Sequence, residues 1–318
     1  MGELLLQVEN LSKSFQTKSG PLQAVNAVSL SLRHGETLGI VGESGCGKTT
    51  LGRTILRLYQ PDGGRIVFDG KAIFDQDEKK QPDMRPYRQK IQMIFQNPAA
   101  ALNPRKTAAQ SIAQALEIHS LTATKEEQAT RVRELLSLVG LRPEDGESYP
   151  HALSGGQQQR VVIARAMAVE PKLLVCDEPV SALDMSIQAQ IVALLKEMQK
   201  SRQLACIFIS HDISVVRQMS HRIAVMYLGS IVELSDSQTL IENPLHPYTK
   251  LLLASVPSAD PNEKIQPPPV GQALASPLEG PGGCPFYPRC PNRESRCAKA
   301  TPPLREIQGG HWAACHLV

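Results

Sequence analysis

A chain of 318 residues with 42% hydrophobic and 20% charged residues has the composition of an ordinary globular protein. Its formal net charge is +3, and residues 284–318, with five basic and two acidic side chains, carry a charge of the same size. So small and localised a charge excludes a nucleic-acid groove. We expect no secretion signal in MGELLLQVEN, and apolar runs such as LACIFIS are too short to span a bilayer.

Strands are predicted first, at LLLQVENLSKSF and in AVNAVSLSLRHGETLGIVG, and the second region leads through a turn into a helix from Lys48 to Tyr59. Helical periodicity then dominates from Ala99 to about Arg165. Alternating patterns return in PKLLVCDEP, LACIFISH and HRIAVMYLGSIVEL, with helices between them. A helical block inserted into a strand-rich core predicts an α/β fold.

Three domains are predicted along the chain. Residues 1–256 form the core, with a helical subdomain at about 99–165. Residues 257–283 are rich in proline and glycine, which favour a linker or wrapping arm. This linker separates the core from a cysteine-containing tail at 284–318, so we expect the tail to lie far from any site in the core.

The segment GESGCGKT matches the phosphate-binding loop G-x-x-x-x-G-K-[ST], in the required place between a strand and a helix. Its backbone N–H groups and the helix N-terminus suit phosphate oxygens, Lys48 suits the β- and γ-phosphates of ATP, and Thr49 suits Mg²⁺. We expect Cys46 to be a small tolerated residue and not a nucleophile. The other predicted nucleotide contacts are Gly42, Ser44, Gly45, Cys46, Gly47 and Thr50.

Two carboxylates, Asp177 and Glu178, come at the end of the apolar strand KLLVCDEP. Beside a phosphate-binding loop, the first carboxylate suits Mg²⁺ and the second suits the attacking water. Paired acids at a strand end are often only a solvated turn, but the upstream loop favours a nucleotide hydrolase.

The segment LSGGQQQRVVIARAM places Ser154 before two glycines and a long helix, which is a second anion-binding helix N-terminus. LSGGQ resembles the signature of the ABC ATPases, and DEPVSALD resembles their Walker B motif and D-loop. The resemblance implies that Ser154 and Gly156 bind the γ-phosphate held by a partner subunit, in a head-to-tail dimer with two ATP molecules between the subunits. It also implies nucleotide contacts for Gly155, Gln157 and Asp184.

Three further residues match this family. His211 in FISHD resembles the histidine that contacts the γ-phosphate, although a lone histidine is more often structural. Gln96 in MIFQNP resembles the Q-loop glutamine at the metal site, which is expected to ligate Mg²⁺ and take part in catalysis. Phe15 resembles the aromatic residue that stacks on adenine, where the family more often has tyrosine.

Within the family, VGESGCGKTTLGRTIL, SYPHALSGGQQQR and NPLHPYTKLLLASVP together resemble the ATP-binding subunits of peptide importers. The resemblance implies a sister ATPase subunit, two membrane permeases, a periplasmic or extracellular substrate-binding protein and a peripheral place on the cytoplasmic face of the membrane. Importers of nickel or other small solutes, and soluble ABC ATPases that act on ribosomes or DNA, remain alternatives. An inactive regulatory subunit is disfavoured because every motif is present.

The tail contains Cys284, Cys290, Cys297 and Cys315. A cytosolic chain keeps its thiols reduced, and this proline-rich tail has too few large residues to bury them in a core of its own. The spacing names no metal, since it lacks the C-x-x-C pairs of zinc ribbons and bacterial ferredoxins. The resemblance to peptide-importer subunits implies a [4Fe-4S] cluster, with zinc or free thiols as alternatives.

Overall fold

The computed structural model describes residues 3–18, 20–255 and 282–318. The chain divides into two compact units. Unit 1 contains Met1–Arg33, Thr37–Pro82 and Phe208–Val318, and unit 2 contains His34–Glu36 and Asp83–Ile207. Apart from Gly282 and Gly283, the predicted linker lies outside the described residues.

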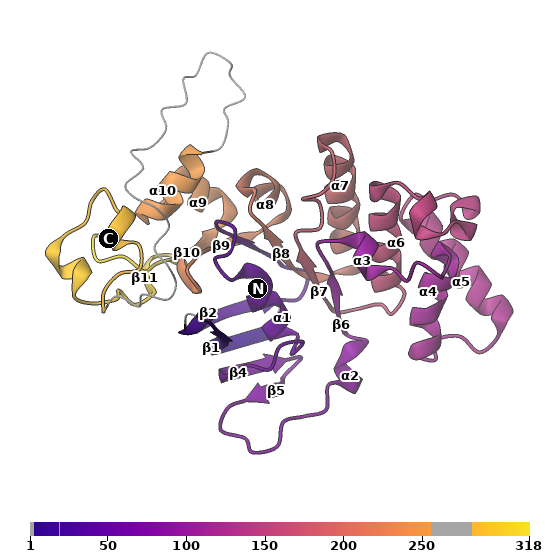
Figure 1. Ribbon diagram of the computed structural model, residues 1–318, viewed down its shortest axis with the longest axis horizontal. Coiled ribbons are helices and arrows are strands. Elements are labelled where there is room, and N and C mark those ends of the chain that lie inside the picture. The colour runs from indigo at the N-terminus through magenta and orange to yellow at the C-terminus, as the bar shows by residue number, and fades with distance from the viewer. Residues whose placement is uncertain (1–2, 19, 256–281) are drawn as a thin grey trace, which may run out of the picture. The chain divides into compact units, whose positions relative to one another are not determined.

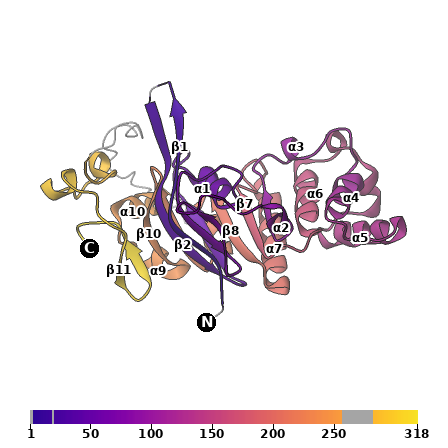
Figure 2. The same cartoon turned by 90° about the horizontal axis from the view of Figure 1, so that it is seen from below.

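One sheet of unit 1 is antiparallel and has the strand order β2-β1-β4-β5. Its long hairpin, β1 with β2, is drawn in indigo in Figure 2. Val8 and Leu11 of β1 are buried in the core, and Val8 lies opposite Ile66 of β4. The strands are β1 (Leu4–Thr17), β2 (Gly20–Arg33), β4 (Gly63–Phe68) and β5 (Lys71–Asp75).

A second set of strands in unit 1 runs in the order β11-β12-β10-β9-β3. The β3–β9 pair is parallel, whereas β10 pairs antiparallel with both β9 and β12. These strands are β3 (Thr37–Val41), β9 (Arg222–Tyr227), β10 (Ser230–Asp236), β11 (Arg305–Gln308) and β12 (His311–Ala313).

The helices of unit 1 are α1 (Lys48–Ile55), α8 (Ile213–Met219), α9 (Ser237–Glu242) and α10 (Pro247–Ala254). Helix α1 begins where the sequence predicts but ends before the predicted Tyr59. Arg57 has a φ of 51°, and this left-handed backbone cannot continue an α-helix.

Unit 2 carries the predicted helical block, and Figure 1 shows α4, α5 and α6 packed side by side. Thr107 and Ser154 form capping boxes at the starts of α4 and α6. The helices are α2 (Arg85–Arg88), α3 (Pro98–Ala101), α4 (Ala108–Ile118), α5 (Lys125–Leu138), α6 (Gly155–Met167) and α7 (Met185–Arg202). Strand β6 (Ile91–Ile94) is parallel to β7 (Leu173–Asp177), and β8 (Ala205–Ser210) begins in unit 2 and ends in unit 1.

The cysteine tail packs against the core of unit 1. Strand β12 extends the sheet beside β10, with Trp312 opposite Leu234. The fully buried Glu233 of β10 holds His311 of the tail, whose Nε2 lies 2.7 Å from Oε1. The Glu233 carboxylate also accepts hydrogen bonds from the backbone N–H groups of Leu245 and His246, each at 2.8 Å. A buried carboxylate with three donors fixes the tail to the start of α10.

Across 3–18, 20–255 and 282–318, no helix combines the length and the apolar character needed to cross a bilayer.

Candidate functional site: phosphate loop, signature helix and cysteine tail

The phosphate-binding loop connects β3 to α1, and its tight turn depends on glycine. Gly47, the residue before α1, has a left-handed φ of 105°, and a Cβ there would lie 2.1 Å from the carbonyl oxygen of Ala24. A Cβ on Gly42 would lie 2.1 Å from the carbonyl oxygen of Met226. Neither position can hold a side chain without moving backbone. The loop therefore has the close-packed form predicted for a phosphate cradle.

Lys48 is buried, and its ammonium group bridges the start of the loop. Nζ donates to the carbonyl oxygens of Gly42, at 2.7 Å, and Glu43, at 2.9 Å. Burial raises the pKa of the neighbouring Cys46 thiol and the Lys48 charge partly offsets this, which agrees with a packing role. Ser44 and Gly45 are exposed. Thr49 and Thr50, in the first turn of α1, are half-buried.

Two other predicted residues belong to unit 1. Phe15 lies near the end of β1, edge-on to Tyr59 with ring centroids 5.4 Å apart. The ammonium group of Lys13 lies 5.4 Å from the Phe15 ring, so this ring already belongs to a small polar-aromatic cluster. His211 follows directly after β8 and is exposed.

In unit 2, Asp177 is the last residue of β7 and is fully buried. Glu178 follows with a φ of 47°, a left-handed conformation that is strained for a residue with a side chain. Gln96, two residues after β6, donates from Nε2 to Oε2 of Glu178 at 3.0 Å. The sequence predicts both residues for the catalytic site, and the structure brings them together.

The signature segment begins α6. The Ser154 hydroxyl accepts the N–H of Gln157 at 3.3 Å, and the Gln157 side chain accepts the N–H of Ser154 at 3.0 Å. Ser154 and Gly155 are exposed, whereas Gly156 is buried. A Cβ on Gly156 would meet Ile187 at 2.7 Å, so α6 needs glycine to approach α7. This arrangement exposes a hydroxyl at a helix N-terminus, as an anion site requires.

Asp184 caps the N-terminus of α7, where its Oδ1 accepts the Ser186 hydroxyl at 2.7 Å and the Ile187 N–H at 3.0 Å. These hydrogen bonds, that from the Ser186 hydroxyl first, lower the pKa of the Asp184 carboxyl. The neighbouring Met185 is 86% exposed, which is unusual for a large apolar side chain. The D-loop therefore presents an anion and an apolar side chain together.

The sequence-based prediction missed one contact. Arg289 of the tail forms a two-pronged ion pair with Glu43 of the phosphate-binding loop, with both N–O distances 2.8 Å. The prediction that the tail lies far from the nucleotide-binding loop was therefore wrong. The sequence shows that the tail has excess positive charge and that GESGCGKT contains an acidic residue. Neither feature indicates which residue the other side of the ion pair comes from.

Burial and neighbouring thiols both raise the pKa of two of the tail cysteines, Cys284 and Cys290. Burial raises the pKa of Cys284, the N–H of Phe286 lowers it, and Cys297, Cys315 and Cys290 raise it further. Cys290 behaves in the same way, with burial first and the N–H of Asn292 opposing it. Within the part of the chain that the structure describes, no three His, Cys, Asp or Glu side chains are arranged to hold a metal ion as they stand. All four thiols are free.

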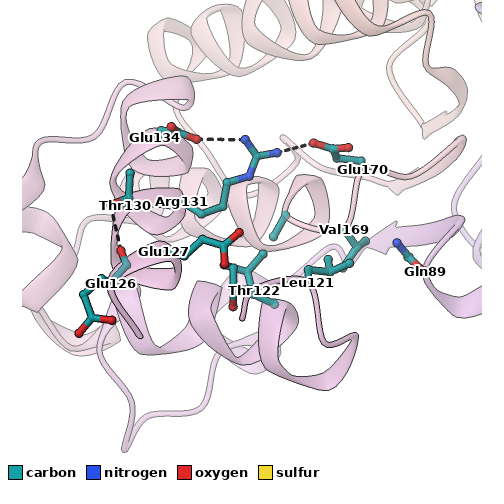
Figure 3. Close-up of a pocket in the computed structure, with 12 residues that line it drawn as sticks. Gln89, Leu121, Thr122, Glu126, Glu127, Thr130, Arg131, Glu134, Val169 and Glu170 are labelled. Atoms are coloured by element: carbon teal, nitrogen blue, oxygen red, sulfur yellow. Dashed lines mark hydrogen bonds and ion pairs between the residues drawn. The ribbon is translucent and has the colours of Figure 1, made fainter. Parts of the chain in front are cut away.

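Figure 3 shows a pocket in unit 2 of about 640 Å³, lined mainly by α5 and the segments before it and after α6. Its one arginine, Arg131, pairs with Glu134 at 3.0 Å and with Glu170. Glu126 and Glu127 leave the lining acidic, so it does not suit phosphate. None of the predicted site residues lines this pocket.

Two family models match the chain. Residues 25–181 match the ABC transporter model, and residues 232–297 match the C-terminal region of oligopeptide and dipeptide transporters. Two Bacillus subtilis proteins are similar over almost their full length. The putative oligopeptide transport ATP-binding protein YkfD is 47% identical, over 98% of this chain and 95% of the relative. The oligopeptide transport ATP-binding protein AppF is 46% identical, over 99% and 98%.

Among solved structures, the ATP-binding cassette MJ0796, in a dimeric post-hydrolysis state bound to ADP and phosphate, matches with a TM-score of 0.65 and 30% identity. The match covers 73% of this chain and 99% of that one. The predicted α/β fold of an ABC ATPase is thereby confirmed. The chain belongs to the ABC transporter ATP-binding proteins, and within them to the oligopeptide and dipeptide importer family.

Proposed function

We propose that this chain is the ATP-hydrolysing subunit that powers import of dipeptides or oligopeptides through a membrane permease. The observation that carries the proposal is the match of residues 232–297 to the oligopeptide and dipeptide transporter C-terminal region, beside a complete set of ABC motifs. An importer of nickel or another small solute is the second candidate. The two relatives named above are oligopeptide transport ATP-binding proteins, and the match covers 95% and 98% of their lengths. This favours a transport subunit over a soluble ABC ATPase.

In unit 1, the phosphate-binding loop holds the phosphates of ATP and Lys48 neutralises the β- and γ-phosphates. Lys48 donates to two loop carbonyls in this structure, so its ammonium group is already aimed into the loop. Phe15 stacks on adenine, and His211 contacts the γ-phosphate.

In unit 2, Glu178 accepts a proton from the attacking water and Gln96 orients the Glu178 carboxylate through the hydrogen bond seen here. We propose Thr49 of unit 1 and Asp177 and Gln96 of unit 2 as ligands of Mg²⁺, which would offset negative charge on the phosphate oxygens. Hard oxygen ligands of this kind suit Mg²⁺, and Asp177 places a carboxyl group at the end of β7.

We propose a head-to-tail dimer, in which Ser154 and Gly156 bind the γ-phosphate held by the other subunit. Three features of unit 2 support it: the exposed Ser154 hydroxyl at the start of α6, the Asp184 anion and the exposed Met185. The partner is a sister ATPase subunit. Two membrane permeases and a periplasmic or extracellular substrate-binding protein complete the importer, which places this chain at the cytoplasmic face of the membrane.

We also propose that Cys284, Cys290, Cys297 and Cys315 hold a [4Fe-4S] cluster. Thiols are the ligands that such a cluster takes, and backbone N–H groups two residues further on face Cys284, Cys290 and Cys315. Such N–H groups stabilise thiolates. Zinc would use the same ligands, and metal analysis after anaerobic purification separates the cases. About four irons per chain support the cluster, whereas stoichiometric zinc contradicts it.

Uptake by cells tests the transport proposal. A strain that lacks the gene is supplied with the wild-type chain or with Lys48→Ala, and accumulation of a labelled dipeptide and of ⁶³Ni²⁺ is measured. We expect only the wild-type chain to restore dipeptide uptake. Restoration of nickel uptake alone would favour the second candidate, and restoration of dipeptide uptake by Lys48→Ala would contradict the proposed role of ATP.

A further inference from the structure

Glu43, the second residue of the phosphate-binding loop, is fixed at three points. Its backbone N–H donates to the Tyr248 hydroxyl of α10 at 2.8 Å. Its carbonyl oxygen accepts from Lys48 Nζ at 2.9 Å, and its carboxylate accepts both arms of Arg289. The residue that receives the Lys48 ammonium group is therefore also the residue that the cysteine tail holds.

Arg289 is enclosed by the tail and the core of unit 1. Its side chain is 9% exposed, and its guanidinium group lies 5.9 Å from the ring centre of Tyr227 and 5.7 Å from that of Phe286. Phe286 packs against Tyr227 and Tyr248, with ring centroids 5.3 and 5.5 Å apart. This aromatic cluster leaves the guanidinium group little freedom, so Arg289 meets Glu43 in one geometry.

The short segment that supplies these contacts lies between two of the cysteines. Phe286 and Arg289 stand between Cys284 and Cys290, and Cys284 is hydrogen-bonded through its N–H to the carbonyl oxygen of Cys297 at 2.8 Å. The local fold of the cysteine segment therefore determines where Arg289 lies.

The charge pair is strong for physical reasons. A two-pronged arginine–carboxylate pair combines charge with two directed hydrogen bonds, and partial burial reduces screening by solvent. Removing Arg289 would leave the Glu43 carboxylate without its cation beside a loop that must accept the negative charge of ATP. The loop would then be both less ordered and more repulsive to phosphate.

We propose that Arg289 is a positioning residue for the phosphate-binding loop, and that through it the cysteine tail sets the affinity of the chain for ATP. The inference rests on the proposed ATP-binding function and adds a residue and a segment outside the ABC motifs. The inference does not depend on which metal the cysteines bind, because the contact with Glu43 is made by the Arg289 side chain.

Binding measurements on the full-length chain test this coupling. Calorimetry with a non-hydrolysable ATP analogue and Mg²⁺ compares the wild type with Arg289→Met, Glu43→Gln and the double variant. We expect Arg289→Met to weaken binding on the order of tenfold, within the 5- to 150-fold range of typical coupling between sites. The double variant should lose less than the sum of the two single losses, because both changes break the same pair.

Arg296→Met serves as the matched control, since Arg296 lies in the same tail and forms an ion pair with the exposed Glu294 at 2.8 Å. It should bind the analogue like the wild type. Melting temperatures without nucleotide are measured in parallel, and Arg289→Lys, which keeps the charge but not the two-pronged geometry, replaces Arg289→Met if the latter does not fold. The lysine variant should lie between the wild type and Arg289→Met in affinity.

Two failures are distinguishable. A wild-type chain that does not bind the analogue contradicts the proposed function and this inference with it. A wild-type chain that binds, while Arg289→Met binds within twofold of it, overturns the inference alone. So does a lysine variant that binds as tightly as the wild type, where it replaces Arg289→Met. The inference would also be overturned if Arg289→Met and Arg296→Met lost the same affinity for the analogue. The loss would then come from the tail's overall charge and not from the contact with Glu43.

Discussion

Replacing Glu178 by glutamine is expected to stop ATP hydrolysis and preserve ATP binding. The Glu178 backbone is held at a φ of 47°, and Gln96 donates to its carboxylate at 3.0 Å. Glutamine has the same shape and keeps an oxygen that can accept the Gln96 hydrogen bond, so the geometry should survive. What is lost is the ability to accept a proton from water. General base catalysis contributes about 10²- to 10⁴-fold, which corresponds to about 3 to 5 kcal/mol of barrier.

Phosphate release at saturating Mg-ATP is the assay, with the sister subunit inactivated and nucleotide affinity measured in parallel. Glu144→Gln is the matched control, because Glu144 is an exposed carboxylate in the same unit. Turnover by Glu178→Gln should fall by the stated factor with affinity unchanged, and the control should behave like the wild type. Hydrolysis within about threefold of wild type in Glu178→Gln would refute the assignment.

Four other outcomes are expected. Lys48→Ala should abolish measurable nucleotide binding by calorimetry, and retained binding would contradict the role of its ammonium group. If Ser154 acts on the other subunit's nucleotide, the specific activity of the isolated chain should rise with its concentration; a fully active monomer would refute this. Phe286→Ala should lower the free energy of unfolding in urea by about 3–5 kcal/mol, since Phe286 is 1% exposed, and a loss below about 1 kcal/mol would contradict its place in the core. Burial lowers the pKa of His246 from 6.5 to about 4. Between pH 6.5 and about pH 4, His246 is therefore protonated in the unfolded chain but not in the folded chain. Stability should therefore fall by about 3 kcal/mol as pH drops through that window, and His246→Gln should remove this part of the fall.

The phosphate loop, the carboxylates at the end of β7 and the signature helix could be predicted from the sequence because each is a local pattern. Their glycines and capping residues are required by nearby backbone, as Gly47 and Ser154 show. The contact between Gln96 and Glu178 joins segments 82 residues apart, yet both were predicted because each carries its own motif. Their roles stay predictions, since geometry without nucleotide does not test them.

The place of the cysteine tail could not be predicted. Pairing of β12 with β10, the buried Glu233–His311 contact and the Arg289–Glu43 pair each join residues far apart in the chain. Strand β12 is only three residues long, and Glu233 lies in an apolar strand without any local sign of a partner. Long-range charge pairs of this kind leave no periodic signal in a single sequence.

Reconstitution in vesicles shows whether ATP hydrolysis by this chain drives dipeptide import. The chain is assembled with its sister subunit and the two permeases in vesicles whose lumen contains Mg-ATP and represents the cytoplasm. A labelled dipeptide and the substrate-binding protein are added outside. The account predicts uptake with ATP and not with ADP, and loss of uptake when Glu178→Gln replaces the wild-type chain. Equal uptake with ADP, or undiminished uptake with Glu178→Gln, would contradict it.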